Sequence, residues 1–198
     1  MNYLAHLHLA DSVGSHLAAN LLADFVRGKP DGRFEPEIAD GIYLHRFIDR
    51  TVDESDEVRQ AKVLFPQPLR RFAGIALDLC WDHYLTIHWP KFHHSPLPHF
   101  LVHAKTELLG FETPPEYGFF ASLQQRLWQE HWIESYQSTS GIMVALERMS
   151  LRRPRLVPLA DCGAHFIQNY DKLEQLFLSL YPQMMTHVQA FSLQAQGR

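Results

Sequence analysis

Acidic and histidine side chains interrupt the apolar face of three segments in this sequence. They are Asp24 in the first segment, His45 and Asp49 in the second, and Asp78, Asp82 and His83 in the third. A buried acid or histidine is costly unless it is paired or binds a metal ion. Residues four apart share one face of a helix, so each spaced pair can point at a common centre. The pattern therefore indicates one polar centre assembled from three helices.

The residue types in these segments favour a divalent cation held by oxygen and nitrogen. Carboxylate and imidazole ligands suit Mn²⁺, Mg²⁺ or Fe²⁺. The two cysteines, Cys80 and Cys162, have no CxxC partner, which argues against a disulfide framework or a structural zinc site. The sequence also contains no GxSxG elbow, no Walker loop and no GxGxxG fingerprint. Metal-assisted hydrolysis is the leading chemical hypothesis.

Each of these residues also has a structural interpretation. A histidine facing inward, as His45 does, is more often a satisfied core residue than a ligand. Asp49 is close enough in sequence to form an ion pair with Arg46 or Arg50, and Asp78 has Arg70 nearby. Taken alone, the residues leave a metal centre and ordinary packing about evenly balanced.

The elements that must position these side chains are helices, because helical periodicity dominates and alternating segments are scarce. We expect helices over 15–27, from Pro36 onward, and over 58–64, 69–89, 99–109, 119–136, 141–150 and 164–191. No a/d heptad pattern persists, so the expected fold class is all-α, an irregular helical bundle rather than a coiled coil. With 198 residues, of which 46% are hydrophobic, the chain is expected to form one domain over residues 1–198.

Charge and hydropathy exclude several classes of partner. The net charge of −4 argues against non-specific binding to nucleic acid. No apolar run reaches the ~20 residues that span a bilayer, and the opening MNYLAHLHLADS has no basic leader. We therefore expect a cytoplasmic protein that has neither a nucleic acid nor a membrane as its partner.

A series of motifs resembles one known family. NYLAHLHLA, NLLADFVRG, GIYLHRFID, LDLCWDHYL, RRPRL and FLSLYPQMM follow one another in the sequence. They are similar to motifs of bacterial acyl-carrier-protein phosphodiesterases, distant relatives of the HD-type metal phosphohydrolases. The resemblance covers nearly the whole chain and is weakest over 89–118. It implies an HD-like helical fold, a divalent cation, and hydrolysis of holo-acyl carrier protein to the apo form and 4′-phosphopantetheine.

The resemblance also implies a set of site residues. The positions that match the metal-site motifs are Asp24, His45, Asp82 and His83. Asp49 and Asp78 are expected beside them, and His6 in the opening motif is a further candidate. The usual HD doublet is His followed by Asp, whereas here the adjacent pair is Asp82-His83, so ligands cannot be transferred one by one from the wider group.

In the mechanism that follows, a divalent cation activates a water molecule. Mn²⁺ is preferred over Mg²⁺ or Fe²⁺ as this cation. Asp49 or Asp78 would orient that water or take its proton, and Arg46 would clamp the phosphoryl oxygens. Acyl carrier proteins are strongly acidic, so the expected docking residues are Arg70, Arg71, Arg152 and Arg153. Two alternatives stay open: an HD-like nucleotide phosphohydrolase, and a metal-stabilised protein that binds the carrier without turnover.

Overall fold

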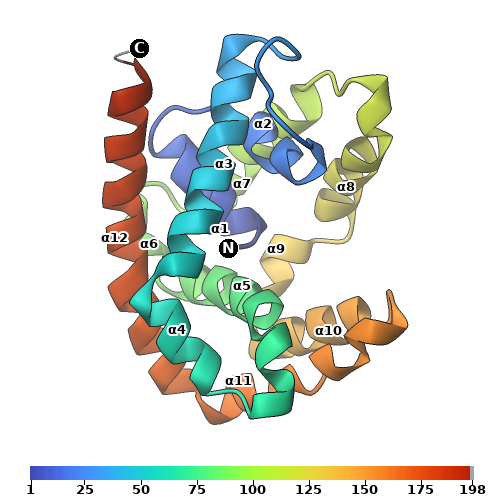
Figure 1. Cartoon of the computed structure of the whole chain (residues 1–198), viewed down its shortest axis with the longest axis vertical. Helices are drawn as coiled ribbons and strands as arrows, with labels where there is room; N and C mark the ends of the chain where they lie inside the picture. The colour runs from blue at the N-terminus through green and yellow to red at the C-terminus, as the bar shows by residue number, and fades with distance from the viewer. Residues whose placement is uncertain (197–198) are drawn as a thin grey trace.

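The computed structural model describes residues 1–196 and is built from helices (Figure 1). The α-helices are α1 (Tyr3–Asp11), α2 (Leu17–Leu22), α3 (Pro36–Glu54), α4 (Asp56–Val63), α5 (Arg70–Ile87), α6 (Trp89–Phe92), α7 (Leu97–Gly110), α8 (Gly118–Gln129), α9 (Trp132–Ser135), α10 (Thr139–Ser150), α11 (Cys162–Gln168) and α12 (Tyr170–Gln196). Short 3-10 segments are η1 (Ala23–Phe25), η2 (Gln67–Leu69), η3 (Pro115–Tyr117) and η4 (Pro154–Leu159). Within residues 1–196 the only β pairing is an isolated bridge between Asp31 and Phe34. The all-α prediction is confirmed.

Helix α1 is the centre of the fold and was not predicted. Every residue from Leu4 to Ala10 is buried, including His6 and His8. It packs against α2, α3, α5 and α12. A helix that is buried on all sides carries no amphipathic pattern, which is why the sequence predicted a first helix only over 15–27. That segment contains α2 and η1.

Helices α2 and α3 pack closely against each other beside the candidate site described below. Pro36 begins α3, as predicted, because its fixed backbone angle suits the first helical turn. Gly41 allows the two helices to approach: a Cβ atom at this position would lie 2.8 Å from the Cβ of Ala19. This contact places Asn20 of α2 beside the face of α3 that carries His45.

Helix α5 crosses beneath α1 and packs against α4, α10, α11 and α12 as well (Figure 1). Twelve of its eighteen residues are buried. Asp82 and His83 are both among them, so burial alone does not separate their roles. Neighbouring positions on a helix face different directions, and the two side chains therefore meet different helices.

Two predicted helices are each divided in the structure. The segment predicted over 119–136 is α8 and α9, separated at His131, which adopts a left-handed backbone with φ 50°. The segment predicted over 164–191 is α11 and α12, separated at Asn169, whose amide nitrogen donates to the His165 carbonyl at 2.9 Å. Helix α12 then runs along α3 and α4 at one side of the molecule (Figure 1). No described helix combines the length and apolar content needed to cross a bilayer.

Candidate functional site

Two imidazoles and two carboxylates converge where α1, α3 and η1 meet. His45 Nε2 lies 3.2 Å from Asp24 Oδ1 and 3.1 Å from Asp49 Oδ2. His6 Nε2 lies 3.0 Å from the other oxygen of Asp49, Oδ1. The His6 and His45 rings stack with their centroids 4.0 Å apart. Asp24, His45 and Asp49 are thus brought together as predicted, and α1 adds His6.

Asn20 determines which ring nitrogen of His6 carries the proton and which one has a free lone pair. The Asn20 amide nitrogen donates to the Gly41 carbonyl at 3.4 Å, so Oδ1 faces His6 Nδ1 at 3.1 Å. An amide oxygen only accepts hydrogen bonds, which means that Nδ1 carries the proton. In the neutral ring, the Nε2 lone pair then points at a carboxylate oxygen of Asp49. That arrangement is repulsive unless a proton or a cation lies between the two atoms.

The cluster concentrates negative charge around a buried imidazole. Burial alone would lower the pKa of His45, but the carboxylates of Asp24 and Asp49 outweigh it and raise the pKa to about 9. Burial opposes ionisation of Asp49, yet the hydrogen bond from His45 and the charge of the Met1 amino group hold its pKa well below its usual range. Burial and the neighbouring His45 lower the pKa of His6 to about 4. One positive charge on His45 therefore faces two carboxylates, and the four side chains together carry a net negative charge.

The cluster is open to solvent along its carboxylate side. The Asp24 side chain is 59% exposed and that of Asp49 is 44% exposed, whereas the histidines are buried. Asp78 borders the cluster through the Met1 amino group, which lies 2.9 Å from Asp78 Oδ1 and 3.7 Å from Asp49 Oδ1. Asp78 thus lies beside the cluster, as expected.

Asp82 does not join this cluster, which corrects the prediction. Its Oδ2 accepts from the Leu4 backbone N–H at 2.8 Å, and its Oδ1 accepts from Ala5 at 3.0 Å. These are orphan donors in the first turn of α1, which Asp82 satisfies from α5. Burial raises the pKa of Asp82 to about 7, while the two N–H donors act in the opposite direction. Asp82 therefore holds the helix that carries His6.

His83 also lies away from the cluster, so the structure does not bring it to the centre at which it was expected. Its Nδ1 donates to the Tyr136 carbonyl at 2.7 Å, and its Nε2 lies 2.8 Å from the Tyr170 hydroxyl. Both ring nitrogens are occupied by α9 and α12. Among the described residues, the group able to surround an ion is His6, His45 and Asp49.

The predicted arginines have different surroundings from those expected. Arg46 donates to the backbone carbonyls of Gly28 and Val26 at 2.7 and 2.6 Å, so it holds the loop after Asp24 instead of facing the cluster. Arg70 donates to the Phe65 carbonyl at 3.2 Å. Arg71 lies over the ring of Phe72, and Arg152 and Arg153 follow α10. The docking role of these last residues stays a prediction.

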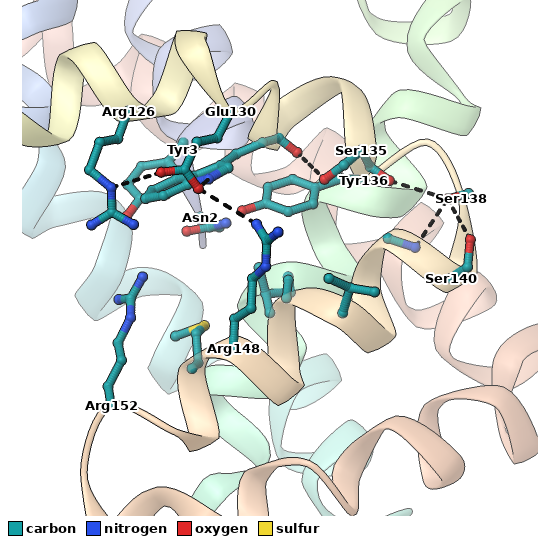
Figure 2. A pocket seen from close by; sticks show the side chains of 16 residues that line it. Asn2, Tyr3, Arg126, Glu130, Ser135, Tyr136, Ser138, Ser140, Arg148 and Arg152 are labelled. Carbon is teal, nitrogen blue, oxygen red and sulfur yellow. Dashed lines mark hydrogen bonds and ion pairs between the residues drawn. The ribbon is translucent and has the colours of Figure 1, made fainter.

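A pocket of about 670 Å³ adjoins the start of α1 (Figure 2). Arg126 lies on α8 and Glu130 directly follows that helix, while Arg148 and Arg152 reach in from the side of α10 (Figure 2). Tyr3 lines the pocket and stacks on Trp132, with ring centroids 6.0 Å apart. No pattern in the sequence predicted this pocket.

Tyr3 links the pocket to the cluster. It lies one helical turn before His6 on α1. Burial, followed by the charge of Asp24, raises the pKa of Tyr3 to about 12, and the charges of Arg152 and Arg126 act against this shift. Helix α1 therefore carries residues of both the pocket and the cluster.

Asn20 contacts the cluster through His6 and was not predicted from the sequence. It is a fully buried amide within the otherwise apolar α2. A buried amide needs hydrogen-bond partners, and this was the one available signal. The signal does not reveal which partner the amide has.

Comparison with known proteins identifies the family. The profile of a family described as acyl carrier protein phosphodiesterase matches residues 1–184. A Klebsiella pneumoniae (strain 342) protein of that name is 45% identical over 188 residues, covering 93% of this chain and 96% of that protein. A Yersinia pestis protein of the same name is 44% identical over 190 residues, covering 96% and 98%. No solved structure matches this chain, and the likeness to HD-type hydrolases stays a prediction. The chain belongs to the acyl carrier protein phosphodiesterase family.

Proposed function

We propose that this protein hydrolyses the phosphodiester that joins 4′-phosphopantetheine to a serine of acyl carrier protein, using a divalent cation held by the His6–His45–Asp49 cluster with Asp24. The observation that carries the metal assignment is the 3.0 Å approach of His6 Nε2 to Asp49 Oδ1, with Asn20 holding the ring proton on the other nitrogen. A cation between these atoms turns a repulsive contact into coordination.

The donor set fits such an ion. Its members are imidazole nitrogens and carboxylate oxygens, which suit Mn²⁺ or Fe²⁺ and, with fewer histidines engaged, Mg²⁺. Their ligand atoms lie within 4.8 Å of one another. When bound, the cation lowers the pKa of a water molecule and stabilises charge on the phosphoryl oxygens. Metal binding would replace the proton on His45, so affinity should fall in acid.

The chain's own residues divide the remaining work. His45 and Asp49 present their donor atoms from one face of α3, and Asn20 keeps His6 in the productive tautomer. Asp78, 42% exposed at the edge of the cluster, is the carboxylate placed to accept a proton from the attacking water. Arg46 acts indirectly, by fixing the loop that follows Asp24.

The substrate assignment follows the family. The curated relatives are named for acyl carrier protein, and this argues against a nucleotide as the substrate. Acidic carriers suit basic docking residues, for which Arg70, Arg71 and Arg153 remain the candidates beside the pocket's Arg152. Carrier-dependent lipid synthesis would place the reaction in the cytoplasm.

Mass spectrometry of the carrier tests this proposal. Purified protein with Mn²⁺ is expected to remove the phosphopantetheine group from holo-carrier, and excess chelator should stop the loss. A nucleotide mixture run in parallel should be left intact. If the carrier mass is unchanged with Mn²⁺, Mg²⁺ and Fe²⁺ in turn, the proposed activity is wrong. Unchanged mass accompanied by nucleotide hydrolysis would favour the nucleotide phosphohydrolase instead.

A further inference from the structure

The pocket between α8, α9 and α10 carries a net positive charge in an acidic protein. Three arginines line it, and Glu130 is the acid among them. Arg126 Nε lies 2.9 Å from Glu130 Oε1, and Arg148 lies 3.5 Å from Oε2. Arg152 has no side-chain partner among the described residues, and its guanidinium faces into the pocket (Figure 2). The pocket therefore has one unpaired positive charge available for an anion.

The rest of the lining changes from charged to neutral along α10. Ser138 and Ser140 lie at the far end from Arg152, at the start of the helix (Figure 2). Between the two ends, Val144 and Met149 give the wall an apolar stretch. Helix α10, which forms this wall, has twelve residues and is therefore about 18 Å long. The pocket is thus long, with an anion site at one end and hydrogen-bonding groups at the other.

The charged end of the pocket lies beside the helix that carries His6. Asn2 and Tyr3 line the pocket at the start of α1, and Tyr3, three residues before His6, lies on the Arg126 side, away from Ser138 and Ser140 (Figure 2). A phosphoryl group at the cluster would therefore leave the molecule attached to it extending along α10. Close packing of α9 and α10 bounds the other end: a Cβ on Gly141 would lie only 1.8 Å from the Ser135 carbonyl oxygen.

We propose that this pocket is the binding subsite for the phosphopantetheine arm, with Arg152 contacting the phosphoryl oxygens and the α10 wall contacting the amides and dimethyl group. The proposal rests on the proposed function and specifies how its substrate is held. A linear chain with one anionic end, two amides and a small apolar branch matches the order of groups along the pocket. Its volume, about 670 Å³, lies within the ~300–1,000 Å³ typical of small-molecule sites.

Calorimetric binding of free 4′-phosphopantetheine and of pantetheine, which lacks the phosphate, tests the subsite without turnover. Arg152→Gln is expected to weaken phosphopantetheine binding by roughly 10- to 100-fold, as for loss of one charged hydrogen bond, and to leave pantetheine binding unchanged. Val144→Trp, which fills the pocket from a partly exposed position, should weaken both ligands. The matched control is Arg155→Gln, an exposed arginine outside the pocket, which should weaken neither.

The outcomes separate this inference from the proposed activity. If Arg152→Gln and Val144→Trp bind phosphopantetheine as the wild type does, or if Arg155→Gln loses as much affinity as Arg152→Gln, the subsite is wrong. The proposed activity still stands in that case if wild-type protein strips the holo-carrier. Conversely, the expected binding pattern in a protein that leaves the holo-carrier intact supports the subsite and contradicts the activity.

Discussion

His45→Ala is expected to lower kcat/KM for holo-acyl carrier protein by roughly a thousand-fold or more, since the cation it helps to hold supplies several kcal/mol of transition-state stabilisation at about 1.4 kcal/mol per factor of ten. His45 Nε2 is the atom that lies between Asp24 and Asp49, at 3.2 and 3.1 Å. Without it, the two carboxylates face each other with no imidazole between them. The measurement is the initial rate of apo-carrier formation with Mn²⁺ in excess.

The matched control is His99→Ala, which removes an exposed imidazole from α7. It should retain wild-type kinetics, and both variants should keep the helical circular dichroism spectrum of the wild type. A folded His45→Ala protein with near-normal turnover would show that the cluster is not where the diester is cleaved. Because His45 is buried, the spectrum is needed to exclude simple unfolding.

Asp82→Ala is expected to lower the free energy of unfolding by on the order of 3 kcal/mol, because two buried N–H groups at the start of α1 would lose their acceptor. Those groups belong to Leu4 and Ala5, whose acceptor within residues 1–196 is the Asp82 carboxylate on α5. Urea denaturation followed by circular dichroism measures the change. The slope with denaturant should stay unchanged, since the same surface is exposed on unfolding.

Mn²⁺ affinity separates this structural role from the ligand role that the sequence favoured. At temperatures where Asp82→Ala is folded, its affinity for Mn²⁺ should match that of the wild type. Asp56→Ala, an exposed acid in an ion pair with Arg59, serves as the control and should change stability by no more than about 0.5 kcal/mol. Normal stability together with lost Mn²⁺ affinity in Asp82→Ala would instead make Asp82 a metal ligand.

The i, i+4 spacing on α3 was sufficient to predict that His45 and Asp49 share a centre. Their partner His6 was harder to place, because α1 is apolar on all sides and its buried histidines follow no face. The adjacent pair Asp82-His83 was the hardest case. Both residues are buried, and one residue along a helix changes the direction of a side chain by about 100°, so sequence cannot tell which neighbouring helix each one meets.

Surface arginines were predicted from charge alone, and their surroundings differ in the structure. Arg46 donates hydrogen bonds to the backbone carbonyls of Val26 and Gly28. Arg152 faces a pocket to which α1, α8, α9 and α10 contribute. His131 separates α8 from α9 with a left-handed backbone, a conformation that no local sequence signal predicted. The long-range packing that creates both environments is not visible in the sequence.

Anomalous diffraction at the manganese edge, from crystals grown with Mn²⁺, would locate the proposed ion. We expect a peak within bonding distance of His6 Nε2, His45 Nε2 and an oxygen of Asp49, about 2.0 to 2.3 Å from each, as for comparable divalent ions. A peak beside Asp82 and His83, or no peak near His45 at saturating Mn²⁺, would contradict the proposed site.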